Sequence, residues 1–220
     1  MRVKICGLKT EEDLQVAIKA GADAVGFLVG QLYASTDFIL PGTAQRLSKI
    51  LPPYISPVVV THLIEADAIL DIIKKTEIFN VQLHGGSSLA DVKKIRDKLP
   101  ESAKIIMALH VIDNQIKPEP EDFIPYVNAF LLDSYNKNTK QIGGTGKIHN
   151  WDISAEFSIK SKLPVILAGG LNPSNVAEAI KKVRPYGVDS NSGLKDEKRN
   201  CSQCLCSEFV KNAKMAFFNT

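Results

Sequence analysis

The stretch that decides the fold runs from Arg2 to Val29 and reads RVKICGLKTEEDLQVAIKAGADAVGFLV. An apolar strand at residues 3–6 precedes a helical pattern that begins after Thr10 and ends at Gly21, and a second apolar strand follows at residues 24–29. Thr10 is a typical N-cap, three acidic residues follow it in the first turn, and glycine commonly ends a helix. The stretch therefore predicts a strand–helix–strand unit with parallel strands.

The same alternation repeats to the end of the chain. Further strands are predicted at residues 57–60, 80–83, 104–109, 129–132, 164–167 and 187–189. Further helices are predicted at residues 43–51, 66–75, 88–99, 152–160, 173–183 and 204–217, while the Pro-rich residues 113–126 leave one helix undecided. About eight such units in 220 residues favour a closed α/β (β/α)8 barrel over an open sheet. No linker is visible, so we expect a single domain over residues 1–220.

Composition limits the function classes. A hydrophobic share of 45% and a charged share of 23% are typical of a globular protein with a substantial core. The net charge of +3 comes from dispersed basic residues, which argues against a nucleic-acid partner. No apolar run approaches the roughly 20 residues of a membrane span, and the first residues lack the apolar region of a signal peptide. Four cysteines without a secretion signal indicate free thiols and a cytoplasmic protein.

Cys6 is the first candidate for chemistry. Side chains alternate along a strand, so Lys4 and Cys6 share one face. The helix-facing side of a barrel strand must be apolar, so this face is expected to point inward, with Cys6 near the rim. A nearby ammonium favours the thiolate, which is the form that removes protons. The alternative is a buried structural cysteine.

Asp133 is the second candidate, because it follows the apolar run of residues 129–132. A carboxyl at the rim of a barrel strand is well placed for general acid catalysis. Burial would raise its pKa and help it to keep a proton near neutral pH. An N-cap or an exposed loop residue is the alternative, with equal weight.

Polar side chains and glycine turns at other strand ends predict the substrate contacts. Gln82 and His84 share a face, and His62 holds the equivalent place after the preceding strand. Loops after the seventh and eighth strands are the usual phosphate site of such barrels, because small residues expose backbone N–H groups. Lys4 and His62 are assigned supporting roles, and Lys4 could pair with Asp189 on a neighbouring strand. The predicted substrate and phosphate contacts are Gln82, His84, Gly144, Gly146, Gly169, Gly170, Asp189, Ser192 and Gly193.

Cys201, Cys204 and Cys206 form a C-x2-C-x-C cluster near the C-terminus. Structural zinc normally takes four ligands, and no clear fourth is visible. We therefore interpret the cluster as a cysteine-rich helix start rather than as a zinc site.

Taken in order, these motifs resemble the phosphoribosylanthranilate isomerase family of tryptophan biosynthesis. The matching pieces are KICGL (4–8), GADAVGF (21–27), QLHG (82–85), LLDS (131–134), GGTG (143–146), LAGGL (167–171), and GVD (187–189) with SG (192–193). The resemblance implies a (β/α)8 barrel that works as an aldose–ketose isomerase on a phosphorylated sugar by an Amadori rearrangement, with neither cofactor nor metal. It also implies that Cys6 is the general base and Asp133 the general acid.

Three departures from the family pattern concern the surroundings of the substrate. Residues 28–39 lack the Ser-Pro-Arg phrase that the family usually carries, contain no arginine, and add Asp37. Ser190-Asn191 stands where the family has Val-Ser, and His62 falls where a Val-Asn-like phrase is common. Loss of a bidentate guanidinium removes a strong carboxylate partner.

Three functions therefore stay open. The leading hypothesis is the isomerase itself. The second is the same barrel acting on a different phosphorylated aminosugar, and the third is a non-catalytic phosphate-ligand binding protein, because fold alone does not fix function. The sequence leaves monomer and homodimer open.

Overall fold

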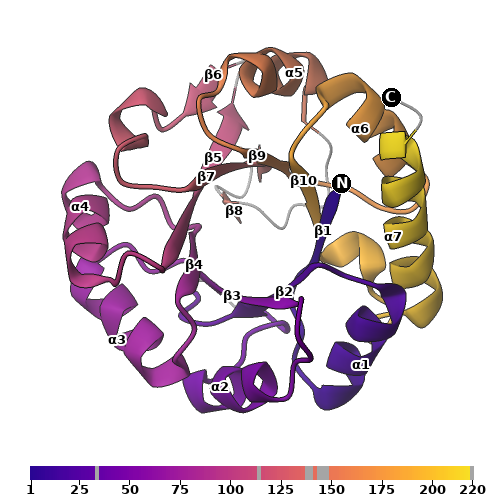
Figure 1. The fold of residues 1–220 in the computed structure, drawn as a ribbon, viewed down its shortest axis with the longest axis horizontal. Helices are drawn as coiled ribbons and strands as arrows, with labels where there is room; N and C mark the ends of the chain where they lie inside the picture. The colour runs from indigo at the N-terminus through magenta and orange to yellow at the C-terminus, as the bar shows by residue number, and fades with distance from the viewer. Residues whose placement is uncertain (33–34, 113–114, 137–140, 143–148, 219–220) are drawn as a thin grey trace.

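The computed structural model of the protein is a ring of parallel strands surrounded by helices (Figure 1). The structure describes residues 1–32, 35–112, 115–136, 141–142 and 149–218. Each strand of the ring pairs with the next, and the ring closes through β10–β1 and β5–β7 pairing. Within the described residues the parallel strands are β1 (Arg2–Ile5), β2 (Ala24–Leu28), β3 (Ser56–Thr61), β4 (Asn80–Leu83), β5 (Lys104–Ile112), β7 (Ala129–Asn136), β9 (Val165–Leu167) and β10 (Gly187–Ser190). The predicted single-domain (β/α)8 barrel is confirmed.

Seven α-helices of the described chain cover the outside of the ring (Figure 1). They are α1 (Glu11–Ala20), α2 (Pro41–Lys49), α3 (Ala66–Thr76), α4 (Leu89–Lys98), α5 (Trp151–Lys160), α6 (Val176–Val183) and α7 (Gln203–Phe218). After β5, where the sequence left the helix undecided, the described chain instead forms the antiparallel strand β6 (Gln115–Lys117) and the 3-10 turn η1 (Glu121–Phe123). A short strand β8 (Gln141–Ile142) pairs with β7, and a 3-10 turn η2 (Ser192–Leu194) follows β10.

The ends of α1 follow the predicted chemistry. Thr10 Oγ1 accepts a hydrogen bond from the Asp13 amide at 3.1 Å, and Gly21 ends the helix with a φ of 81°. The start of α6 was predicted wrongly, because the helix begins at Val176 rather than at residue 173. Asn172 Oδ1 accepts from the amides of residues 174 and 175, so this side chain closes a separate turn before the helix.

The core has two layers. One lies between the strands and the helices, and the other lies inside the barrel, so the two faces of a strand pack in different layers. Val3 and Ile5 belong to the large apolar layer between the strands and the helices. Cys6 packs in a small cluster with Leu28, Val58 and Val60 inside the barrel. The predicted alternation on β1 is therefore confirmed, and the reactive face of this strand points inward.

Two strands extend further than expected toward the C-terminal end of the barrel. β5 runs to Ile112 and β7 to Asn136, so His110 and Asp133 lie within strands rather than after them. These two residues are register partners across the β5–β7 pair. Their side chains are thereby fixed by strand geometry rather than by a loop.

Candidate active site

Lys4 holds together one side of the barrel interior. Its side chain is buried, and Nζ donates to Asp189 Oδ2 at 2.6 Å and to Gln82 Oε1 at 2.8 Å. The Cys6 sulfur lies 3.5 Å from the same nitrogen. The possible Lys4–Asp189 pair is therefore present, and it joins β1 to its neighbour β10.

Cys6 occupies the space that a glycine on the neighbouring strand leaves free. A methyl group at Gly26 would lie 2.5 Å from the Cys6 sulfur and 3.0 Å from Lys4 Cε. Burial raises the pKa of Cys6 to about 12, although Lys4 acts in the opposite direction. Lys4 therefore favours the thiolate, as expected, but loss of hydration outweighs the nearby charge and the pKa of Cys6 is raised.

A chain of hydrogen bonds crosses the barrel from Lys4 to Asp133. Gln82 Oε1 accepts from Lys4, so Gln82 Nε2 is the donor to His84 Nδ1, at 3.0 Å. His84 Nε2 therefore carries the hydrogen that faces Asp133 Oδ2, at 3.2 Å. Through Gln82 and His84 the surroundings of the thiol and the carboxyl are coupled, although the two groups are remote in sequence.

Asp133 is buried, and its Oδ1 accepts from the Ser134 amide at 2.6 Å. Burial alone would raise its pKa, but the hydrogen bond from His84, and then the charges of His84 and His110, hold the pKa below its usual range. The predicted increase is therefore wrong in direction. The physical reason is a partner on β4 that the sequence around Asp133 does not reveal.

All four histidines of the chain gather around Asp133. The ring of His84 lies 5.3 Å from that of His62 and 5.6 Å from that of His110, between centroids. Burial lowers the pKa of both His62 and His110 to about 4, so both are neutral at pH 7. His149 comes close as well, since its Nδ1 and Asp133 Oδ1 lie 3.1 Å and 3.0 Å from where a methyl at Gly169 would stand.

His110 and His149 were not among the sequence candidates. A signal for His110 exists, because it continues the inward face that residues 106 and 108 begin on β5. His149 follows the glycine-rich residues 143–146 and precedes α5, and no local pattern marks it. Among the described residues neither ring nitrogen of His110 has a hydrogen-bond partner, although the side chain is 6% exposed.

The glycine turns after β9 and β10 lie against each other. Gly169 and Gly170 have φ values of 81° and 67°, which disfavour other residues. A methyl at Gly193 would lie 2.2 Å from the Leu171 carbonyl oxygen, so the two loops are in close contact. Ser190 Oγ donates to the same carbonyl at 2.6 Å and ties the loops together. Ser192 and Gly193 lie in η2, whereas Gly144 and Gly146 fall outside the described residues.

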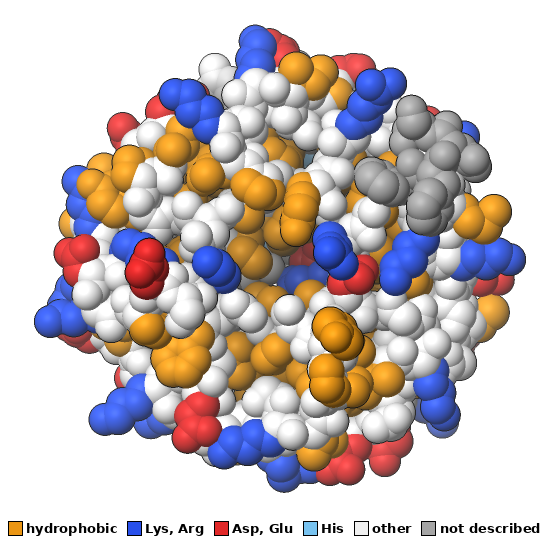
Figure 2. All heavy atoms as spheres, viewed as in Figure 1, with side chains coloured by type: hydrophobic (Ala, Val, Ile, Leu, Met, Phe, Trp, Pro, Cys, Tyr) orange, Lys and Arg blue, Asp and Glu red, His pale blue; other side chains and the backbone are white. Residues whose placement is uncertain are grey.

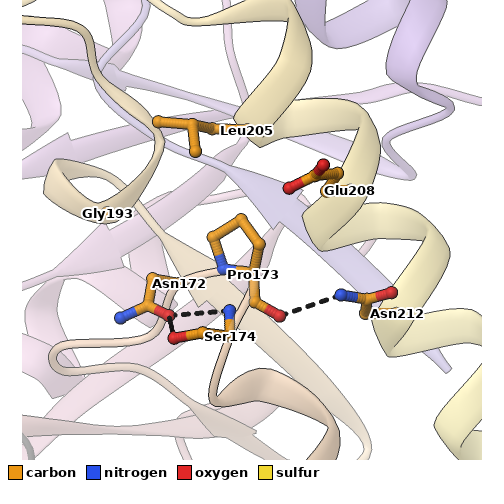
Figure 3. A pocket seen from close by; sticks show the side chains of 7 residues that line it. All are labelled: Asn172, Pro173, Ser174, Gly193, Leu205, Glu208 and Asn212. Atoms are coloured by element: carbon orange, nitrogen blue, oxygen red, sulfur yellow. Dashed lines mark hydrogen bonds between the residues drawn. The ribbon is translucent and has the colours of Figure 1, made fainter.

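A cavity of about 360 Å³ lies beside these loops and against α7 (Figure 3). Its lining residues are Asn172, Pro173, Ser174, Gly193, Leu205, Glu208 and Asn212. It contains none of Cys6, His84 and Asp133, and the carboxylate of Glu208 at its edge opposes an anion. This cavity is therefore distinct from the group of residues around Cys6 and Asp133.

Figure 2 shows charged side chains of both signs interspersed over the face in view. None of the described helices is both long and apolar enough to cross a bilayer. Cys201 and Cys206 are buried while Cys204 is exposed, and the described residues contain no group of three or more His, Cys, Asp or Glu placed to hold a metal ion.

A (β/α)8 barrel whose mouth holds a thiol and a carboxyl, beside two glycine turns, is of the class that acts on small phosphorylated molecules. Residues 3–211 match the family model described as N-(5'-phosphoribosyl)anthranilate (PRA) isomerase. The chain belongs to this family, whose members are intramolecular oxidoreductases (aldose–ketose isomerases) of tryptophan biosynthesis. The predicted family is thereby confirmed.

Individual relatives cover nearly the whole chain. The N-(5'-phosphoribosyl)anthranilate isomerase 2 of Methanosarcina mazei is 42% identical over 218 residues, which are 99% of this chain and 96% of that protein. The crystal structure of the Thermotoga maritima enzyme has 33% identity and a TM-score of 0.79, covering 98% of this chain and 99% of that one. A PRA isomerase in complex with reduced 1-(o-carboxyphenylamino)-1-deoxyribulose 5-phosphate has 32% identity and a TM-score of 0.76, with the same coverage.

Proposed function

We propose that the chain converts N-(5'-phosphoribosyl)anthranilate to 1-(o-carboxyphenylamino)-1-deoxyribulose 5-phosphate, with Cys6 as general base and Asp133 as general acid. One observation carries the proposal. Cys6 and Asp133 are both buried in the mouth of one barrel, directly after β1 and on β7, and the groups that surround them are joined by the hydrogen-bond chain through Gln82 and His84.

The reaction needs one acid and one base on the same sugar. Asp133 gives a proton to the furanose ring oxygen, the bond from C1 to that oxygen breaks, and a protonated Schiff base forms at C1. Cys6 then removes the proton from C2, which leaves an enolamine that tautomerises to the aminoketose. Each proton transfer of this kind contributes about 10²–10⁴-fold to the rate.

The substrate itself supplies charges that shift both groups toward these roles. The phosphate and carboxylate of the substrate are anions, and an anion near Asp133 favours the protonated carboxyl. The Schiff base formed in the first step is a cation, and it favours the thiolate of Cys6 when C2 lies against the sulfur. In the free protein the pKa of Cys6 is raised and the pKa of Asp133 is lowered. Both groups therefore need the charges of the substrate to take up these roles.

The supporting contacts divide into two groups. Backbone N–H groups of the turns at residues 169–170 and 192–193 are suited to the phosphate, as in other barrels. Gln82 is occupied by Lys4 and His84, so we assign it to positioning rather than to direct binding. Asp189 Oδ2 is likewise bonded to Lys4, while Asp189 Oδ1 has no partner among the described residues. Roles for Gly144 and Gly146 stay predictions.

The decisive experiment is a fluorescence assay with freshly made PRA. We expect wild-type turnover, and loss of at least about 10³-fold in kcat for Cys6→Ala and for Asp133→Asn, with the fold retained by circular dichroism. Full activity of both variants would remove this mechanism. Complementation of a tryptophan auxotroph tests the same function in cells.

A different phosphorylated aminosugar stays the second candidate, because residues 28–39 contain no basic side chain for a carboxylate. Binding without turnover of any aminosugar phosphate would instead indicate a non-catalytic protein. The T. maritima enzyme is described as dimeric, and light scattering on this protein would decide between monomer and homodimer. We expect a cytoplasmic enzyme, which fractionation tests.

A further inference from the structure

A buried carboxylate lies in the loop after β2, where the chain has no basic residue. Asp37 is 1% exposed, and its Oδ2 accepts hydrogen bonds from Asn191 Nδ2 at 2.9 Å and from Arg199 Nη2 at 2.8 Å. Asn191 and Arg199 both come from the loop after β10. A charge this deeply buried is stable only when it is paired, so Asp37 and Arg199 fix each other and join the two loops.

Arg199 is held by its backbone as well as by its side chain. Its φ of 63° is uncommon for a residue other than glycine, and such strain persists only where the surroundings determine it. Its amide donates to the Asp196 carbonyl at 3.0 Å, and its own carbonyl accepts from Lys9 Nζ at 2.9 Å. The guanidinium nevertheless stays open to solvent, with its side chain 41% exposed.

This cluster of Asp37, Asn191 and Arg199 lies next to the proposed base. Asn191 directly follows β10, and a methyl at Gly7 would lie 2.5 Å from its Oδ1. Gly7 directly follows Cys6 in sequence. The loops after β1, β2 and β10 are neighbours at the C-terminal end of the barrel, so Arg199 stands over the Cys6 side of the mouth.

The other cations on this side are already engaged. Lys4 pairs with Asp189 and Gln82, and buried Lys195 donates to the Gly7 carbonyl at 2.6 Å. A guanidinium has five N–H donors in a planar fork, and among the described residues the guanidinium of Arg199 donates only one hydrogen bond, to Asp37. The remaining donors match the geometry of a carboxylate.

We propose that Arg199 is a specificity-determining residue that binds the aryl carboxylate of the substrate, and that Asp37 is a positioning residue that holds its guanidinium in place. The inference rests on the proposed function, because only a substrate with an anionic aglycone needs this group. The reacting sugar carbons then lie beside Cys6, and the phosphate reaches the turns after β9 and β10.

The test uses two ligands that differ in one group. The first is reduced 1-(o-carboxyphenylamino)-1-deoxyribulose 5-phosphate, and the second is the same compound with a plain phenyl ring. We expect Arg199→Gln to weaken binding of the first by about 10- to 100-fold in titration calorimetry. Binding of the second should stay within about twofold, because that ligand offers nothing to the guanidinium.

Arg184→Gln is the matched control. Arg184 also has a left-handed backbone, with a φ of 51°, but it ends α6 at the opposite end of the barrel, just before β10 begins. It should change neither affinity. Asp37→Asn should reduce affinity for the carboxylate ligand in the same direction as Arg199→Gln, but by less, since the guanidinium remains and only its anchor is weakened.

Kinetics give a second readout on the same samples. With PRA, Arg199→Gln should raise KM with little change in kcat, which is the pattern of lost uniform binding. Equal losses for both ligands, or no loss for the carboxylate ligand, would overturn the role of Arg199. A wild-type protein that fails to turn over PRA would overturn the proposed function instead, so the two failures are distinguishable.

Discussion

Two sides of the barrel mouth differ in whether their buried polar side chains have hydrogen-bond partners. On the β1 side, the Lys4 ammonium is satisfied by Asp189, Gln82 and the Cys6 sulfur. On the β5 side, directly across the ring, His110 keeps both ring nitrogens without a partner among the described residues. The Lys4 ammonium thus has its partners without a ligand, although Asp189 Oδ1 beside it has none among the described residues, whereas the His110 ring has no partner at either nitrogen.

Breaking the ion pair on the β1 side should have the largest effect. Lys4→Met leaves Asp189 buried without its cation, and removal of one partner of a buried pair typically costs about 3–5 kcal/mol of the free energy of unfolding. Urea denaturation at pH 7 measures the loss. Lys4→Met should also lower kcat, because Gln82 loses the Lys4 donor that orients its amide toward His84.

The double variant Lys4→Met with Asp189→Asn is the control for this prediction. It removes both charges, so it should recover part of the stability that the single variant loses. A single variant as stable as the wild type would show that the pair does not hold the barrel interior.

The side of the mouth that holds His110 should affect how the free energy of unfolding depends on pH. The pKa of His110 is about 4 in the folded protein, against an ordinary value of 6.5. Between these values the unfolded chain binds more protons than the folded one, so the free energy of unfolding falls as pH drops from 7 toward 4. His110→Phe removes this contribution, which is on the order of 2 kcal/mol at pH 4.5.

The measurement is the urea denaturation midpoint of the wild type and of His110→Phe, each at pH 7 and at pH 4.5. His62, His84, His149 and Asp133 face His110 and are present in both proteins, so only the difference between the proteins reports on His110. An identical acid-induced loss in the two proteins would mean that the buried ring of His110 is charged or accessible in the folded state.

The two sides also differ in how far the sequence predicted them. Lys4 and Cys6 were assigned to the inner face by strand alternation alone, and the strand order then made Lys4–Asp189 a plausible pair. Such features depend on one strand and its neighbour. The place of Asp133 at the barrel mouth was predicted as well, but the direction of its pKa shift was not, because His84 on β4 contributes from another strand.

The contact of Arg199 with Asp37 could not be predicted from local sequence patterns at all. Its pairing with Asp37 joins positions 162 residues apart, and neither residue lies in a regular strand. The absence of an arginine in residues 28–39 was visible in the sequence, but the residue that lies against Asp37 was not. Only the folded arrangement of the loops after β2 and β10 supplies it.

The packing around Cys6 gives the smallest and most local prediction. Gly26→Ala places a methyl 2.5 Å from the Cys6 sulfur, so the side chain and the strand must shift, at a cost of about 1–2 kcal/mol in the free energy of unfolding. Gly42→Ala in α2 is the matched control, because nothing lies within 4 Å of its added methyl and alanine favours a helix.

If the cause is the sulfur, then adding Cys6→Ala to Gly26→Ala should return most of the lost stability, measured by the same urea denaturation. A double variant no more stable than Gly26→Ala alone would place the conflict at the Cys6 backbone, 3.2 Å from the same methyl, and would leave the thiol free to move toward the substrate.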